Sequence, residues 1–223
     1  MRIIALLCLI SFAVQAEKPS FKKWKTPLVL GIASGLTYNP FAKQIQTNIV
    51  APGKVTPLDD YIQFAPTAIN IGAHLAGFKG QNEAFDQAGI FILGTGIYAA
   101  TAYGLKVTVT EARPDGKEHT FPSGHVTTAF FGATILAHEF GDTHPEFVIA
   151  GYTLATATAA LRIANNEHWV TDVLMGSALG IASAELAYLL YPKVRHQWQK
   201  LNRFTLTPQV APAYYGASMS IGF

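Results

Sequence analysis

Three groups of polar residues, spread over the 67 residues from Lys106 to Asp172, carry the side chains that could do chemistry in this chain. They supply three cations, a hydroxyl, two imidazoles and a carboxylate. Cations neutralise phosphoryl oxygens, and an imidazole can attack phosphorus or protonate a leaving oxygen, so the set suits binding and transfer of a phosphate. The groups are Lys106 with Arg113-Pro114, then Pro122-Ser123-Gly124-His125, then Arg162 with His168 and Asp172.

The pair His168 and Asp172 has the spacing of a histidine nucleophile and its orienting carboxylate. Residues four apart share one face of a helix, so Asp172 can accept one ring N–H of His168. The other ring nitrogen is then unprotonated and available for attack. Such a pair alone is usually a surface contact, and the surrounding cations are what favour phosphoryl chemistry. These cations are Lys106, Arg113 and Arg162.

The tetrapeptide from Pro122 to His125 lies where an apolar helical run begins. A helix N-terminus presents unpaired N–H groups and the positive end of its dipole to an anion, and Gly124 lets that anion approach the backbone. Ser123 can add a hydroxyl, and His125 can protonate the leaving oxygen. Taken alone, the tetrapeptide also fits an ordinary serine cap. The neighbouring cations favour the phosphate site.

Apolar runs with helical periodicity must position these groups, and we expect an all-α bundle of five to six core helices. If the last four helices alternate in direction, the three groups meet at one rim of the bundle. Residues 39–60, rich in Pro, Gly, Asn and Thr, are expected to form an irregular connection, and residues 28–36 at most a short helix or strand. The expected helices cover residues 60–78, 83–105, 125–140, 145–163 and 169–191.

Polar residues beside the three groups carry further expectations. Asn165 and Asn166 are expected to cap the helix that begins near His168. Glu111, in the loop between the first two groups, is expected to be solvated, with contact to a substrate headgroup as the alternative. Glu185 is either a surface charge of a soluble bundle or a buried polar residue of a spanning one.

The two ends of the chain differ from its middle. Arg2, an apolar run and the small-residue end at Ala16 predict a cleavable secretory signal at residues 1–16, since the run is short for a membrane anchor. The lone cysteine, Cys8, lies inside it, so we expect an exported fold without disulfides. After the signal we expect an N-terminal extension and irregular segment at 17–59 and the helical core at 60–191. We expect a C-terminal tail at 192–223. Its last ten residues, 214–223, alternate apolar residues with mostly small ones, and together with residues 205–210 they predict a short C-terminal β-hairpin.

The sequence leaves open whether the helices span a membrane. The uncharged runs are mostly shorter than the roughly 20 residues that a span needs. If residues 60–78 and 83–105 crossed as a pair, the loop 138–146 would face the cytoplasm without Lys or Arg, against the positive-inside tendency. A membrane-embedded bundle and a periplasmic, membrane-associated bundle both remain open.

Together the three groups resemble the signature motifs of the type 2 phosphatidic acid phosphatase superfamily, which is shared with vanadium haloperoxidases. The resemblance rests on Lys106-x6-Arg113-Pro114, on Pro122-Ser123-Gly124-His125 and on Arg162-x5-His168-x3-Asp172. The family usually has Ser before the arginine of the third motif, whereas this chain has Leu161 there. The departure leaves Ser123 and the cations in place.

The resemblance implies a role for each of these residues. His168 would be the nucleophile that forms a phosphohistidine, Asp172 would orient it, and His125 would be the general acid. No metal or other cofactor is implied. The residues that would bind phosphate are Lys106, Arg113, Ser123, Gly124 and Arg162.

The expected function is hydrolysis of a phosphate ester or anhydride on a membrane lipid in a bacterial cell envelope, with the active site facing the periplasm. Candidate substrates are phosphatidic acid, phosphatidylglycerophosphate, undecaprenyl diphosphate and the phosphates of lipid A. Membrane lipids are the expected partners. The 16 Lys and Arg nearly balance the 14 Asp and Glu, which argues against nucleic acid. The alternatives are a soluble nonspecific periplasmic acid phosphatase, a vanadium haloperoxidase and a non-catalytic lipid-binding protein.

Overall fold

Helix α7 (Gly124–Phe140) lies at the centre of the bundle, because its sequence is apolar around much of its circumference. A helix of that kind is stable only where its neighbours cover all of its sides. Val126, Ala133 and Leu136 on this helix are fully buried. Helices α5 (Ala65–Leu75) and α8 (Pro145–Ala164) pack along it. The core of the fold is therefore built around the helix that begins at Gly124.

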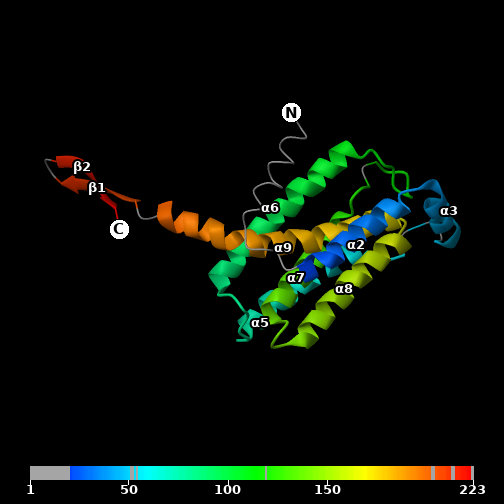
Figure 1. The fold of residues 1–223 in the computed structure, drawn as a ribbon, viewed down its shortest axis with the longest axis horizontal. Helices are drawn as coiled ribbons and strands as arrows, with labels where there is room; N and C mark the ends of the chain where they lie inside the picture. Colours follow the sequence, from blue (N-terminus) through cyan, green and yellow to red (C-terminus); the bar gives the residue numbers. More distant parts are fainter. Residues whose placement is uncertain are drawn as a thin grey trace. The chain divides into compact units, whose positions relative to one another are not determined.

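The computed structural model describes residues 21–50, 53, 55–118, 120–201, 204–211 and 214–221. Its helical bundle confirms the all-α prediction (Figure 1). Helices α6 (Ala84–Thr108), α7 and α8 begin and end within three residues of their predicted bounds. Helix α9 (Val170–Leu201) continues past its predicted end at Tyr191, through Pro192. The predicted signal at 1–16 lies outside the described residues. The remaining helices are α2 (Phe21–Thr37), α3 (Pro40–Ile49) and α4 (Asp59–Ile62).

The prediction of an irregular segment at 39–60 was wrong, because this segment contains α3 and the start of α4. The dipeptide Asn39-Pro40 suggests a turn, but here it begins a helix. The Asn39 side chain accepts a hydrogen bond from the N–H of Ala42, and Pro40 occupies the first helical position, where its missing N–H does no harm. Residues 28–36 likewise belong to the 17-residue helix α2.

The single helix predicted at 60–78 is instead split into α4 and α5. Pro66 lies in the first turn of α5, where it is compatible with a helix start and not with a helix interior. Helix α5 has 11 residues, or about 16 Å of length, which is too short to cross a bilayer. The pair of spanning helices that the charge argument assumed is therefore absent from this part of the described chain.

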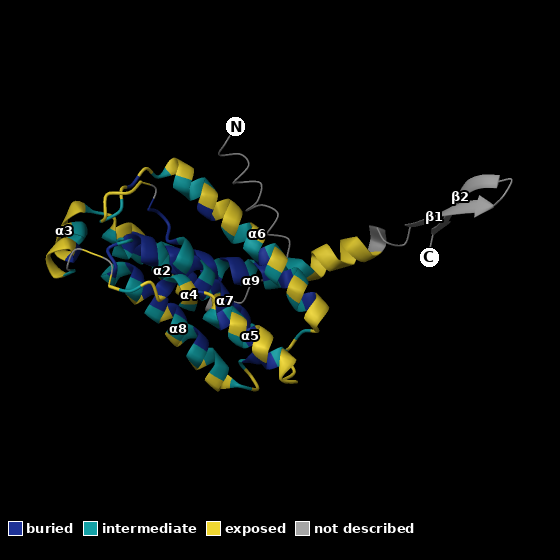
Figure 2. Cartoon of the chain, turned by 180° about the vertical axis from the view of Figure 1, so that it is seen from behind, coloured by how far each residue is buried: buried dark blue, intermediate teal, exposed yellow. Residues whose placement is uncertain are grey.

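Among the described residues, three helices are long and apolar enough to cross a membrane, namely α6, α8 and α9. Helix α6 is the clearest case, since only 11% of its apolar window is buried by the protein. Figure 2 shows exposed and half-buried residues along most of its length. An apolar helix that its own protein leaves uncovered needs lipid around it. These helices indicate that the chain associates with a membrane.

Glu185 on α9 is paired inside the bundle. Its Oε1 lies 2.9 Å from Nε2 of His138 on α7, and both side chains are largely buried. A buried, paired carboxylate is what a spanning helix requires, whereas a soluble bundle would place such a charge at its surface. Its environment therefore favours the membrane-embedded alternative.

The chain from residue 188 onward belongs to a second compact unit. There, β1 (Phe204–Ala211) and β2 (Tyr214–Ile221) pair as antiparallel strands, with Phe204 opposite Ile221. This is the hairpin that the alternating tail sequence predicts.

Glycines on α9 allow it to approach α7 closely, and Gly180 is the tightest point. A Cβ at this position would lie 2.5 Å from the carbonyl oxygen of Thr127 and 2.8 Å from the nitrogen of Phe131. Both are backbone atoms, so α9 would have to move. We expect Gly180→Ala to reduce the free energy of unfolding by about 1–3 kcal/mol, measured as a lower thermal midpoint in detergent.

The control for this prediction is Gly96→Ala on α6, whose Cβ would meet no heavy atom within 4 Å. This variant should not lower the midpoint. Equal midpoints for the two variants would contradict the close contact between α7 and α9.

Candidate active site

The buried imidazole of His168 is held through its Nδ1 nitrogen. Nδ1 lies 3.2 Å from Oδ2 of Asp172 and 3.0 Å from Oγ1 of Thr120. The Thr120 hydroxyl donates to Asp172 Oδ2 over 2.5 Å. Because that hydroxyl proton is already used, Nδ1 carries the ring proton and donates it toward these oxygens. Nε2 is then the unprotonated nitrogen.

The Asp172 residue also joins the segments that meet at this histidine. Its Oδ2 accepts the N–H of Trp169 over 2.8 Å, at the start of α9. Its backbone oxygen accepts the N–H of Ser123 over 3.1 Å, at the start of α7. The first turns of α7 and α9 are therefore fixed to each other beside the imidazole.

The environment keeps His168 uncharged. Burial lowers its pKa to about 4, because a charged imidazolium would lose its hydration there. Asp172 opposes this shift, and the positive charges of Arg162 and Arg113 add to it. At neutral pH the ring is therefore neutral, the form in which Nε2 can act as a nucleophile.

Ser123 precedes α7, but its side chain does not cap the helix. Within the described part of the chain, its buried Oγ has no hydrogen-bond partner. The ordinary serine cap considered for this tetrapeptide is therefore not formed. Gly124 is the first residue of α7, and a Cβ there would meet no heavy atom within 4 Å. The hydroxyl and the helix start remain available to a ligand.

The structure brings the three cations together around the histidine. Arg113 and Arg162 are close enough for their charges to act on His168, and both also act on Lys106. Among the described residues, the Nε atoms of Arg113 and Arg162 are buried without a hydrogen-bond partner. Unpaired buried donors are unfavourable, and an anion bound between them would satisfy them together with Ser123.

Three carboxylates that the sequence did not suggest surround Arg162. Its Nη1 lies 2.7 Å from Asp59 Oδ2 and 3.6 Å from Asp60 Oδ1, and its Nη2 pairs with Glu167. The Asp59-Asp60 dipeptide is visible in the sequence, but nothing in its spacing connects it with an arginine 103 residues away. The site therefore has less excess positive charge than its three cations alone would give.

Asp60 also contacts the second histidine of the site. Nε2 of His125 lies 3.1 Å from Asp60 Oδ1. Burial and the charge of Arg162 lower the pKa of His125, while Asp60 and Asp59 act in the opposite direction. Removal of the Asp60 charge would therefore make His125 harder to protonate.

Helix α3 supplies another residue that the sequence did not suggest. Gln46 is buried, and its side chain spans the backbone that carries the nucleophile. Nε2 of Gln46 donates to the carbonyl of His168, and its Oε1 accepts the N–H of Val170, each over 2.9 Å. Its detection from sequence would have required recognition of α3 as a helix.

Two expectations for loop residues need correction. Asn165 does not cap α9 as expected, because it is the C-cap of α8 and bonds through its side chain to Thr56 and Asp59. Asn166 follows it with a positive φ of 55°. Glu111 is buried and paired with Lys43 of α3, where a solvated residue was expected. Burial raises the pKa of Glu111, and Lys43 opposes this shift.

In the described ranges, no cluster of three or more His, Cys, Asp or Glu is arranged to hold a metal ion. The polar residues of the site are instead arranged around an imidazole and cationic donors. That arrangement suits an anion such as phosphate.

The part of the chain that carries this site is similar to known proteins. Residues 87–196, which contain all three groups, match the PAP2 superfamily. A curated relative, lipid A 1-phosphatase of Porphyromonas gingivalis, is 34% identical over 186 residues, covering 80% of this chain. The chain spans 41% of the length of that relative.

Two solved structures are also similar to the chain. The crystal structure of Aquifex aeolicus LpxE has 18% sequence identity and a TM-score of 0.48, over 72% of this chain and 93% of that one. The transmembrane PAP2-type phosphatidylglycerolphosphate phosphatase from Bacillus subtilis has 19% identity and a TM-score of 0.44, over 87% of this chain and 96% of that one.

The fully buried carboxylate of Asp59 should stabilise the fold through its bonds to Arg162 and Asn165. We expect Asp59→Asn to lower the free energy of unfolding by about 3 kcal/mol, because it leaves a buried guanidinium with one partner fewer. Thermal unfolding in detergent measures this. Asp60→Asn is the matched control, since the Asp60 side chain is 40% exposed, and it should unfold near the wild-type midpoint. Similar midpoints for the two variants would contradict this assignment.

Proposed function

Because the chain belongs to the PAP2 superfamily, we propose that it is a phosphatase that removes a phosphate group from a membrane lipid through a phosphohistidine intermediate. The observation that carries the proposal is the state of His168. Its Nδ1 is bound to Asp172 and Thr120, so its unprotonated Nε2 is left for the substrate. The unpaired donors of Ser123, Arg113 and Arg162 support a phosphate site beside it.

In the first step, Nε2 of His168 attacks phosphorus as the bond from phosphorus to the leaving oxygen breaks. The developing imidazolium charge is stabilised by Asp172, which already accepts from Nδ1. His125 gives its proton to the leaving oxygen. The product alcohol then departs, and the phosphoryl group stays on His168.

In the second step, water attacks the phosphohistidine and the N–P bond breaks. His125, now neutral, accepts a proton from that water and so returns to its starting state. The lone pair returns to Nε2 of His168. Inorganic phosphate is the second product.

The phosphate group is held by cations and by the start of α7. Positive charge near the equatorial oxygens stabilises the transition state of phosphoryl transfer. The Ser123 hydroxyl and the N–H groups at the start of α7 add donors without a net charge. The residues proposed to bind phosphate are Lys106, Arg113, Ser123, Gly124 and Arg162.

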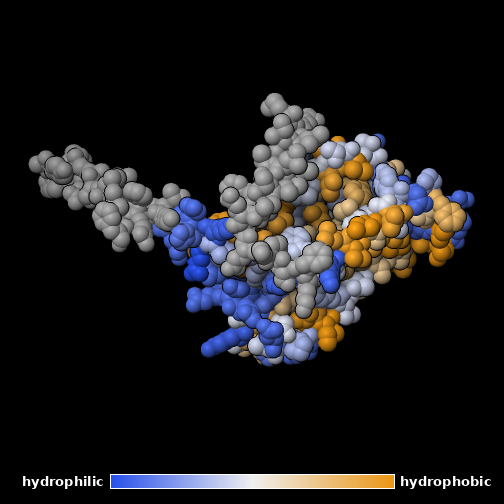
Figure 3. Space-filling model, in the orientation of Figure 1, coloured by the Kyte–Doolittle hydropathy of each residue, from blue (hydrophilic) through white to orange (hydrophobic). Residues whose placement is uncertain are grey.

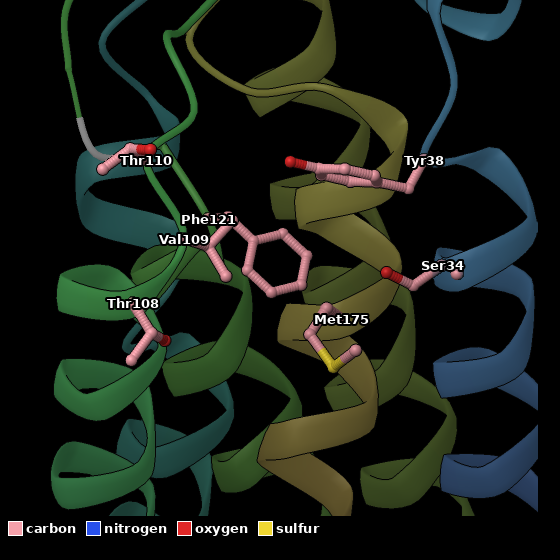
Figure 4. Close-up of a pocket in the computed structure, with 8 residues that line it drawn as sticks. Ser34, Tyr38, Thr108, Val109, Thr110, Phe121 and Met175 are labelled. Carbon is pink, nitrogen blue, oxygen red and sulfur yellow. The ribbon is translucent and has the colours of Figure 1, made fainter.

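A cavity next to the site supports a lipid substrate. It has a volume of about 440 Å³ and lies between α2, the end of α6 and α9. Figure 4 shows Phe121, Met175 and Tyr38 among the residues that line it. Phe121 follows Thr120, the residue that contacts His168. Phe121 of the cavity lining is thus the sequence neighbour of a residue that contacts the nucleophile. The lining combines apolar side chains with the hydroxyls of Ser34, Thr108 and Thr110, and its apolar part suits the start of an acyl chain.

Among the candidate lipids, the phosphates of lipid A are the first to test, since the curated relative is a lipid A 1-phosphatase. A location in the bacterial envelope, with the site facing the periplasm, would give access to such a substrate. Helices α6, α8 and α9, which are long and apolar enough to cross a bilayer, support a position in the membrane.

The proposal predicts that the protein reconstituted in detergent or vesicles releases phosphate from lipid phosphates faster than from soluble monoesters. The panel is lipid A, phosphatidic acid, phosphatidylglycerophosphate and undecaprenyl diphosphate. Quenching in alkaline denaturant, in which a phosphohistidine survives, should trap a phosphoenzyme from ³²P-labelled substrate, and His168→Ala should lose both turnover and the trapped species. Arg162→Ala should mainly weaken phosphate binding and transition-state stabilisation.

Full phosphatase activity in His168→Ala would overturn the mechanism. Preference for soluble monoesters would favour the acid phosphatase. Halide oxidation after addition of vanadate would favour a haloperoxidase, and substrate binding without phosphate release would favour a non-catalytic lipid-binding protein.

The role of the cavity predicts an effect of filling it. A Cβ at Gly35 would meet no heavy atom within 4 Å, and Gly35 lines the cavity. We expect Gly35→Phe to lower kcat/KM for a long-chain lipid phosphate by about tenfold, which is the effect of losing the burial of two methylene groups. The kcat/KM for a soluble aryl phosphate should not change. Gly31→Phe is the control, because Gly31 lies one turn away on α2 outside the cavity lining. Equal losses on both substrates would contradict an acyl-chain site.

A further inference from the structure

Helix α3 has an uncovered apolar stripe on its outer face. Phe41, Ile45 and Ile49 are each four residues apart, so they share one face of the helix. Their exposed fractions are 72%, 43% and 76%. Figures 1 and 2 show α3 at one end of the bundle, running across it and not along it.

The inner face of α3 contacts both loops of the candidate active site. Gln46 bonds the carbonyl of His168, on the loop before α9, and the N–H of Val170, the first residue of α9. Lys43 pairs with buried Glu111, on the loop between α6 and α7. The same helix therefore fixes the two loops that carry the nucleophile and the phosphate-binding groups. Its outer stripe is left to face away from the protein.

The contact between Gln46 and the start of α9 has a specific physical role. The first N–H groups of a helix have no partner within it, and Val170 is the first residue of α9. Gln46 satisfies this N–H and also holds the carbonyl of His168. The backbone on the C-terminal side of His168 is thus fixed at two points, which limits rotation of the residue that carries the imidazole.

The surroundings of the stripe favour lipid as its partner. The exposed apolar residues Leu28, Ile32 and Leu36 continue it along α2, and in Figure 3 the hydrophobic colour extends along α2 toward α3. The surface that three side chains on a 10-residue helix can bury is far smaller than the roughly 800 Å² per partner that a stable protein interface needs. The exposed residues between them are polar and uncharged, as the headgroup region tolerates. These are Gln44, Thr47 and Asn48.

We propose that α3 is an interfacial helix, with Phe41, Ile45 and Ile49 lying in the headgroup region of the bilayer while Gln46, on its inner face, acts as a positioning residue for His168. The catalytic part of this inference rests on the proposed function. Lipid contact on one face then holds the backbone of the nucleophile from the other.

Lipid contact is tested without any activity measurement. In a Cys8→Ser background, Ile45→Cys is labelled with a fluorophore and the full chain is reconstituted in vesicles that contain brominated phosphatidylcholine. The fluorescence of the label should be lower in these vesicles than in vesicles without bromine. Lys117→Cys, on an exposed loop side chain, is the control and should not. A label on Ile45→Cys that is not quenched would overturn the lipid contact. Disulfide cross-linking of two copies through unlabelled Ile45→Cys would also overturn it.

Positioning is tested by Gln46→Leu, which keeps the shape of the side chain and removes both hydrogen bonds. For lipid and soluble aryl phosphates alike, kcat should fall about tenfold to a hundredfold, as displacement of a reacting group does, with KM unchanged. Wild-type kcat in Gln46→Leu would overturn the positioning role. A rise in KM without a change in kcat would also overturn it.

The coupling is tested by the triple variant Phe41→Ser, Ile45→Ser and Ile49→Ser. In vesicles it should lower turnover of both lipid phosphate and a soluble aryl phosphate, because both need the positioned nucleophile. In detergent, where the stripe has no bilayer to contact, it should leave turnover of the aryl phosphate at the wild-type level. The matched control replaces the exposed polar residues Gln44, Thr47 and Asn48 with Ala and should behave as wild type. Unchanged turnover in vesicles by the triple Ser variant would overturn the coupling. Absence of phosphatase activity in the wild-type protein would instead overturn the proposed function. The fluorescence test of lipid contact would remain valid in that case, because it does not depend on activity.

Discussion

The carboxylate of Asp172 is the contact on which the arrangement of this site depends. It accepts from His168, Thr120 and Trp169, and the backbone of the same residue accepts from Ser123. One residue thereby orients the imidazole and fixes the starts of α7 and α9 to each other. Because Asp172 is fully buried, its hydrogen bonds are shielded from water, and water cannot replace a partner that is lost. The orientation of the nucleophile and the packing of the two helices are therefore one constraint.

The sequence predicts this site better than it predicts what surrounds it. The spacing of His168 and Asp172 within one helical turn predicts their contact, because that contact is local. The carboxylates of Asp59 and Asp60 reach Arg162 only through the folded bundle. No local sequence pattern predicts a contact between residues 103 positions apart. The charge balance of the site is therefore visible only in the folded structure.

The fold follows the same division between local and distant causes. Helices α6, α7 and α8 were predictable from long apolar runs, because periodicity over many residues is a strong signal. Helix α3 was missed, since its ten residues follow directly on Asn39, begin with Pro40 and carry apolar side chains along one face only. The same dipeptide suits a turn or a helix start, and packing of Gln46 and Lys43 against distant loops decides between them. Short helices held by tertiary contacts are where sequence reasoning is weakest.

Asp60 has a consequence for what happens after the reaction. Its carboxylate contacts both His125 and Arg162, and these are two of the groups proposed to act on the phosphate. An anion that belongs to the protein thus competes with the product anion for the same partners. When inorganic phosphate leaves, Asp60 can take its place, so departure does not leave the positive charges uncompensated. On the proposed function, Asp60 therefore offsets part of the positive charge that would otherwise hold the product in the site.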